Sequence, residues 1–165
     1  MASLRAALTR VVLITVALTT LALASAPVAA AAETSTEYDL VYATAHGQLG
    51  DQWKHRARGP SRFDCSGLVW YAFYENELQD RIGGYRSVAG YVNWFKERGL
   101  KSKTDPQLGD LVVWGANQHI GIYIGDGQAI STLTTRRGVA IHPVKGYLNI
   151  PFKTYLHTTL TRPSD

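Results

Sequence analysis

The hydrophobic period of the chain changes near Gln107, and this change limits the folds that the chain can adopt. Before Gln107, apolar residues recur every three or four positions, which indicates amphipathic helices. After it, short runs rich in β-branched and aromatic residues are separated by glycine-containing turns, which indicates strands. Helices followed by a meandering antiparallel sheet predict an α+β fold with five to six strands.

Three helices are expected before the change of period. The first covers residues 37–49 and is ended by Gly50, the second begins at Cys65 with Asp64 as its N-cap, and the third covers residues 87–98. Five strands are expected after the change, at residues 110–114, 120–124, 128–132, 139–144 and 153–160.

The first 32 residues have the pattern of a secretory signal. Arg5 and Arg10 precede an apolar run at residues 11–23, and a string of small residues follows. A membrane anchor is the alternative, but the alanine-rich end favours cleavage near Ala30–Ala32. We therefore expect a secreted or cell-wall protein with one domain at residues 33–165 and no stable membrane anchor after cleavage.

The charge of the expected mature chain is nearly balanced. Of the 17 lysines and arginines, removal of Arg5 and Arg10 leaves 15 against 13 acidic residues, a formal charge of +2. This balance gives no reason to expect nucleic acid as a partner. Because no histidines or acids have the spacing of metal ligands, we expect no metal and no cofactor. We also expect a monomer.

Cys65 is the only cysteine of the chain, so an exported protein cannot use it for an internal disulfide. A small buried hydrophobic residue is one possible role. Its position at a helix N-terminus instead predicts a nucleophile, because the helix dipole favours thiolate and the N–H groups of Cys65 and Ser66 can hold an oxyanion. Asp64 would repel a thiolate, so we expect its carboxylate to turn toward a cap or a substrate amine.

A cysteine nucleophile needs a base, and histidine is the usual one near neutral pH. His119 opens the strand expected at residues 120–124, where rigid structure can hold it toward the helix. We therefore expect His119 to be the catalytic base. The other candidates are His46, His55, His142 and His157.

Three segments, in this order, resemble motifs of the NlpC/P60 cysteine peptidases. They are Asp-Cys-Ser-Gly-Leu-Val at residues 64–69, Gly-Asp-Leu-Val at 109–112 and His-Ile-Gly-Ile-Tyr-Ile-Gly-Asp-Gly at 119–127. The resemblance covers roughly residues 38–155. It implies a papain-like fold and cleavage of amide bonds in peptidoglycan stem peptides, of the D-glutamyl-diaminopimelate type.

The resemblance also implies a residue that orients the ring of His119. Family members commonly have a polar residue, often histidine, twelve positions after the catalytic histidine, and this chain has Ser131 there. His142 is an alternative orienting residue. A hairpin centred near Arg136, however, would place His142 beside Ile130 and facing away from Ser131.

The expected substrate-binding residues are Asp64, Ser66, Trp53 and Ser87. Where the family often has a tyrosine followed by Trp-Gly-Gly, this chain has Trp53 and a run of basic residues. Ser87 resembles a serine or threonine that follows an arginine in the family. The basic loop at residues 51–62 is either a solvated loop or a rim that attracts substrate carboxylates.

The leading functional hypothesis is a secreted cysteine hydrolase of peptidoglycan stem peptides, with Cys65, His119 and Ser131 as its catalytic residues. Two alternatives are a catalytically weakened module that binds the cell wall, and a cysteine–histidine amidase or acyltransferase that acts on another substrate.

Overall fold

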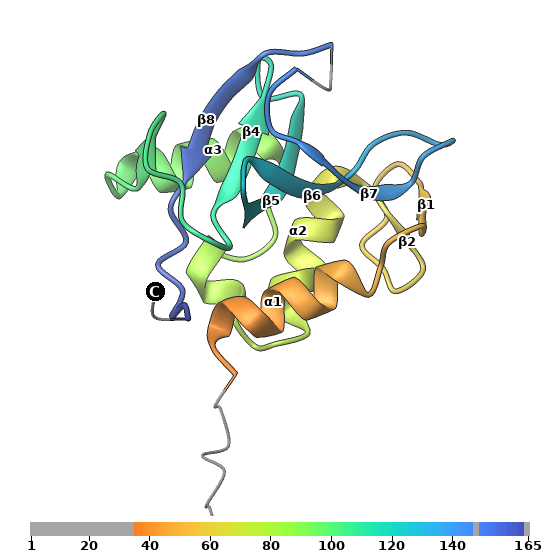
Figure 1. Ribbon diagram of the computed structural model, residues 1–165, viewed down its shortest axis with the longest axis horizontal. Helices are drawn as coiled ribbons and strands as arrows, with labels where there is room; N and C mark the ends of the chain where they lie inside the picture. Colours follow the sequence, from red (N-terminus) through yellow and green to blue (C-terminus); the bar gives the residue numbers. More distant parts are fainter. Residues whose placement is uncertain (1–34, 147–148, 164–165) are drawn as a thin grey trace, which may run out of the picture. The chain divides into compact units, whose positions relative to one another are not determined.

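The computed structural model describes residues 35–146 and 149–163, and the predicted secretory signal lies outside the described residues (Figure 1). Within this part of the chain the expected α+β order is confirmed. The elements are α1 (Glu37–His46), β1 (Gln52–Trp53), β2 (Arg62–Phe63), α2 (Cys65–Tyr74), a 3₁₀ turn η1 (Gln79–Ile82), α3 (Val88–Glu97), β3 (Lys101–Ser102), β4 (Leu111–Trp114), β5 (His119–Gly125), β6 (Gln128–Thr132), β7 (Val139–Pro143) and β8 (Phe152–Leu156).

Each helix begins at a polar N-cap residue. Thr36 and Asp39 form a capping box at α1, the Asp64 side chain accepts from an N–H in the first turn of α2, and the Ser87 side chain does the same at α3. The helix expected at residues 37–49 ends early, at His46. Gly47 is the C-cap residue, and its N–H donates to the carbonyl oxygen of Ala43.

The main sheet has the strand order β3-β8-β4-β5-β6-β7, and its pairings are antiparallel. Strands β4 to β7 form the expected meander. β8 does not continue that meander next to β7; it returns across the sheet and pairs with β4 on one side and β3 on the other (Figure 1).

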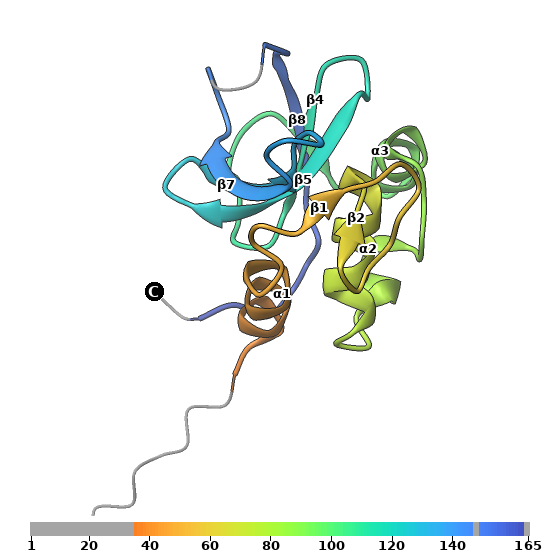
Figure 2. The same cartoon turned by 90° about the vertical axis from the view of Figure 1, so that its right-hand side faces the viewer.

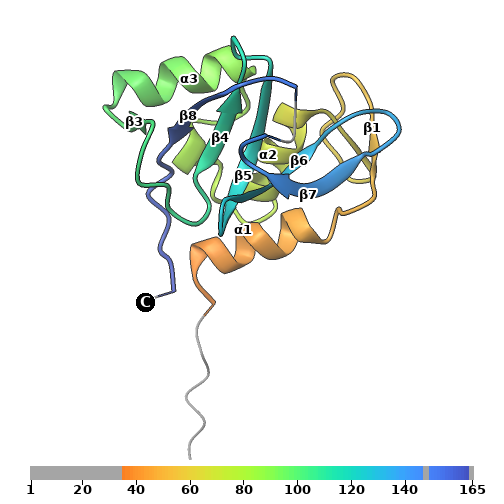
Figure 3. The same ribbon diagram turned by 45° about the horizontal axis from the view of Figure 1, so that its top comes forward.

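The helices α2 and α3 lie on one side of the sheet, and α1 crosses below one end of it (Figures 2 and 3). Residues alternate between the faces of β4, as in any strand. Leu111 and Val113 belong to the core that the helices cover, whereas Val112 and Trp114 belong to a second cluster on the opposite face. Val144, from the connection that leads to β8, packs into that second cluster.

The register of β6 and β7 differs from the one expected from sequence. Ser131 pairs with Ala140 and Ala129 pairs with His142, so the hairpin is centred between residues 135 and 136. A register change of one residue turns every side chain of a strand to the other face. The expectation that His142 faces away from Ser131 was therefore wrong: both side chains lie on the same face.

The basic loop at residues 51–62 contains a small parallel pairing that was not expected. Gln52 and Trp53 pair with Arg62 and Phe63. The loop also touches the helix that carries Cys65, where a Cβ on Gly67 would overlap the carbonyl oxygen of Ala57. The glycine after Cys65 and Ser66 therefore lets the loop and the start of α2 pack closely.

Candidate active site

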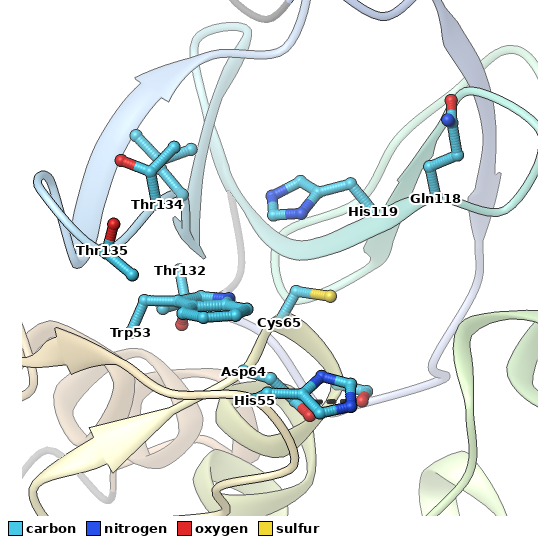
Figure 4. Close-up of a pocket in the computed structure, with 11 residues that line it drawn as sticks. Trp53, His55, Asp64, Cys65, Gln118, His119, Thr132, Thr134 and Thr135 are labelled. Atoms are coloured by element: carbon cyan, nitrogen blue, oxygen red, sulfur yellow. Dashed lines mark hydrogen bonds between the residues drawn. The ribbon is translucent and has the colours of Figure 1, made fainter.

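A pocket of about 550 Å³ opens between the N-terminus of α2, the start of β5 and the connection from β6 to β7 (Figure 4). Five of the seven site residues expected from sequence line this pocket, and they are Trp53, Asp64, Cys65, Ser66 and His119. The lining residues are Trp53, His55, Asp64, Cys65, Ser66, Gln118, His119 and Thr132 to Thr135.

Cys65 is the first residue of α2 and is half-buried in this pocket. The Asp64 carboxylate accepts hydrogen bonds from the Gly67 N–H at 2.6 Å and from the Ser66 hydroxyl at 2.8 Å. Asp64 therefore acts as the helix cap, as expected. The N–H groups of Cys65, Ser66 and Ile120 all approach the thiol.

The thiol is not activated in the way that its position suggested. Burial, followed by the charge of Asp64, raises the pKa of Cys65, and the three backbone N–H groups offset this only in part. The sequence-based expectation of a thiolate in the free protein is therefore wrong. The loss of solvation and the charge of Asp64 outweigh the backbone N–H groups, and the residue rests as a thiol at neutral pH.

His119 begins β5 and is 8% exposed. Burial and the nearby His142 lower the pKa of His119 to about 4. The imidazole is consequently neutral at neutral pH, which leaves it able to accept a proton. The N–H of Ile120, the next residue, approaches the Cys65 thiol, so the start of β5 adjoins the start of α2.

Ser131 does not line the pocket and lies fully buried behind His119. Its hydroxyl oxygen is 2.8 Å from Nε2 of His119 and 2.7 Å from Nε2 of His142. Nδ1 of His142 is 3.0 Å from the carbonyl oxygen of Pro143. The structure thus contains a hydrogen-bonded chain, His119–Ser131–His142, that ends on a backbone carbonyl.

Two neighbours hold this hydrogen-bonded chain in place. The indole of Trp114 packs beside the rings of both histidines, with centroid distances of 5.4 Å, and its N–H donates to the Val144 carbonyl. Gly121 lies directly under Ser131, and a Cβ there would come within 2.8 Å of the Ser131 Cβ. Glycine is needed at this position because the two strands approach so closely.

The walls of the pocket differ in character. Trp53 and His55 come from the basic loop, and the other charged residues of that loop do not line the pocket. Thr132 contributes a hydroxyl that is buried without a hydrogen-bond partner among the described residues. Ser87 is also outside the lining residues, and its hydroxyl caps α3.

Sequence reasoning did not single out Gln118, the Thr132–Thr135 segment or the position of His142. Gln118 adjoins the expected base, which was a usable signal. Thr132 ends an expected strand and residues 133–135 follow it, and these three residues line the pocket because of the path of the β6–β7 connection. Within residues 35–146 and 149–163, no group of three histidine, cysteine, aspartate or glutamate side chains is arranged to hold a metal ion.

The same ranges contain no helix that is long and apolar enough to cross a membrane.

Comparisons with known proteins agree with this fold. The probable endopeptidase p60 of Listeria grayi is 37% identical over 116 residues, which cover 68% of this chain and 21% of that protein. The peptidoglycan endopeptidase RipA of Mycolicibacterium smegmatis is 32% identical over 113 residues, which cover 61% of this chain and 21% of that protein. The chain thus spans about a fifth of the length of these two relatives.

Solved structures share the fold. The NlpC/p60 domain of the peptidoglycan hydrolase SagA aligns with a TM-score of 0.57 at 24% identity, covering 72% of this chain and 97% of that one. RipD of Mycobacterium tuberculosis, described as a non-catalytic NlpC/p60 domain protein adapted to peptidoglycan binding, aligns with a TM-score of 0.55 at 24% identity, covering 79% of this chain and all of that one.

Residues 50–157 match the NlpC/P60 family. This range includes the start of α2, the start of β5 and the strands behind them. The papain-like α+β fold expected from the sequence motifs is confirmed by the solved relatives. The chain therefore belongs to the NlpC/P60 family.

Proposed function

We propose that this protein is an exported cysteine hydrolase that cleaves amide bonds in peptidoglycan stem peptides, with Cys65 as nucleophile and His119 as base. One observation carries the proposal: a buried neutral imidazole and a thiol at a helix N-terminus line the same pocket. A neutral imidazole can take the thiol proton, and the helix N-terminus can stabilise the charge that then develops.

The first chemical step transfers a proton and forms a bond. Nε2 of His119 is occupied by Ser131, so Nδ1 takes the thiol proton as the Cys65 sulfur attacks the substrate carbonyl carbon. The carbonyl oxygen becomes an oxyanion, and the N–H groups of Cys65 and Ser66 donate to it. The intermediate then collapses, the amide C–N bond breaks, and His119 returns the proton to the leaving amine.

The second step releases the acyl group. Water attacks the thioester carbon while His119 Nδ1 accepts one of its protons, and the C–S bond then breaks. The departing sulfur recovers the proton from His119, which restores the neutral pair. Cys65 and His119 both rest neutral in the free protein. The His119 imidazolium therefore exists only while the substrate carries the negative charge of the oxyanion.

The substrate assignment rests on the relatives and on the pocket. Two relatives are named as peptidoglycan endopeptidases, LytE of Bacillus subtilis as a probable one and RipA. In this chain Trp53 offers an apolar wall to the stem peptide, and Asp64 offers a polar group. We propose the D-glutamyl-diaminopimelate bond from the resemblance of the sequence motifs to the family, and a cell-wall location from the names of the relatives. We also propose that the protein acts as a monomer.

The test is digestion of purified cell-wall sacculi by the parent protein and by Cys65→Ala and His119→Ala variants. Mass spectrometry of the released muropeptides identifies the bond that is cut. We expect cleaved stem peptides from the parent and none above background from either variant. His46→Ala is the matched control, because this histidine is exposed on α1 and away from the pocket-lining residues.

Each alternative has a distinct outcome in this experiment. A protein that binds sacculi but releases no peptide, with or without Cys65, would be a wall-binding module. A parent that forms the thioester with other amides or esters but leaves sacculi intact would be an amidase or acyltransferase on another substrate. Either result would overturn the proposed substrate.

A further inference from the structure

His142 is fully buried, and its ring is connected to His119 through one hydroxyl group. It lies eleven residues beyond Ser131, on the neighbouring strand β7, and no atom of it lines the pocket. A group in this position cannot touch a substrate there. It can act on catalysis only through the orientation and the protonation pattern of the groups between it and the pocket.

The directions of the three hydrogen bonds follow from one fixed end. The Pro143 carbonyl oxygen can only accept, so Nδ1 of His142 carries a hydrogen and donates it. A neutral His142 ring then has a lone pair on Nε2, and the Ser131 hydroxyl donates to it. The Ser131 oxygen is left to accept from Nε2–H of His119.

The reverse set of hydrogen-bond directions is unfavourable because it would require a positively charged His142. If the Ser131 hydroxyl donated to His119, Nε2 of His142 would have to donate to Ser131, and His142 would carry hydrogens on both nitrogens. That ring would be a buried cation beside Trp114. Burial opposes this state, and it lowers the pKa of His142.

We propose that His142 is a positioning residue that selects, through Ser131, the tautomer of His119 with its hydrogen on Nε2 and its lone pair on Nδ1. This inference rests on the proposed function, in which Nδ1 takes the proton of Cys65. The backbone carbonyl of Pro143 sets the direction of the first bond, and each later bond follows from the one before it. Ser131 alone, which can donate or accept, would leave the tautomer of His119 undetermined.

Two variants distinguish the effect of the hydrogen-bond acceptor on His142 from the effect of the shape of its ring. His142→Phe keeps a planar ring beside Trp114 but removes the acceptor, so the Ser131 hydroxyl can turn and donate to His119. In this variant the His119 ring would then carry its hydrogen on Nδ1. His142→Gln keeps an amide oxygen that can reach the place of Nε2 and accept from Ser131.

We expect His142→Phe to lower kcat by about 10- to 1000-fold with little change in KM, since wrong-tautomer variants of similar triads lose up to about 10⁴-fold. His142→Gln should stay within about tenfold of the parent, because the amide keeps the acceptor. In a Ser131→Ala background, His142→Phe should add no further loss, because its route to His119 is already broken.

A substrate-free measurement reads the same effect directly. The ¹⁵N chemical shifts of His119 distinguish a hydrogen on Nε2 from one on Nδ1. We expect the Nε2–H tautomer in the parent and in His142→Gln, and a shift toward Nδ1–H in His142→Phe. Thermal unfolding of each variant shows whether a loss of activity comes from a loss of folded protein.

Several results would overturn the role of His142. An Nδ1–H tautomer in the parent would do so, even if His142→Phe does not fold. Equal losses in the Phe and Gln variants, or an unchanged tautomer in a folded His142→Phe, would show that His142 only fills space. The spectrum needs no turnover, so a parent that cleaves nothing would overturn the proposed hydrolase function without deciding this one.

Discussion

The buried, neutral state of His119 makes the protein sensitive to acid. The pKa of this ring falls from the ordinary 6.5 to about 4 in the folded protein, chiefly because burial penalises the charged form. Between these two values the unfolded chain binds a proton at this ring and the folded protein does not. The free energy of unfolding therefore falls as the pH falls from 6.5 to 4, and the ring contributes no pH dependence above that window.

The size of the effect follows from the shift. A fall in pKa from 6.5 to about 4 corresponds to about 3 kcal/mol of stability lost at pH 4 relative to pH 7. A His119→Gln variant has no ionisable group at this position and should lose about 3 kcal/mol less than the parent over the same interval. Carboxylates that also titrate in this range are common to both proteins, so their contribution cancels in the comparison.

The assay is urea unfolding of the parent and of His119→Gln at pH 7 and pH 4. The measured quantity is the change in the free energy of unfolding between the two pH values, for each protein. His46→Gln removes an exposed histidine and should behave like the parent. If the parent and His119→Gln lose the same free energy on acidification, His119 is not held neutral by burial and the reasoning about the base is refuted.

The other predictions concern the neighbours of the site. Thr132→Val removes a buried hydroxyl that has no partner among the described residues; stability should not fall, and KM for stem peptides should rise severalfold if that hydroxyl meets the substrate. An unchanged KM would remove Thr132 from the binding site. Gly121→Ala places a methyl group 2.7 Å from the Ile130 carbonyl oxygen and 2.8 Å from the Ser131 Cβ, so we expect a loss of about 1–3 kcal/mol by thermal unfolding and a lower kcat. A variant as stable and active as the parent would show that the two strands separate freely. Ser131→His should reduce activity, since the buried serine lies within 3 Å of a ring on each side, and adding His142→Ser should restore part of it by returning the space. Full activity of the single variant in a peptide-cleavage assay would contradict this packing argument.

Local interactions made much of the fold predictable. Asp64 was recognisable as an N-cap and Ser87 as the start of a helix, because capping depends on residues within one helical turn. The alternation from residue 110 onward identified β4 to β7 for the same reason. β3 and the two-residue strands β1 and β2 were missed, because such short segments contain no period to detect.

The place of β8 in the middle of the sheet also could not be predicted from a sequence pattern. The alternation of apolar residues identifies a strand but not its partner, and β8 pairs with β4, about forty residues earlier in the chain. The place of Ser87 is similar. Its resemblance to a family element suggested a substrate-binding residue, but the path of the chain keeps it out of the lining of the pocket.

The sequence by itself determined the nucleophile and base candidates, Cys65 and His119, because a lone cysteine at a helix start and a histidine at a strand start are local features. Tertiary structure decided their resting charge, since burial raises the pKa of one and lowers that of the other, and burial is a property of the whole fold. It also decided that His142 lies behind Ser131. A register difference of one residue was enough to turn that ring to the other face, and only the packing of the complete sheet selects the register.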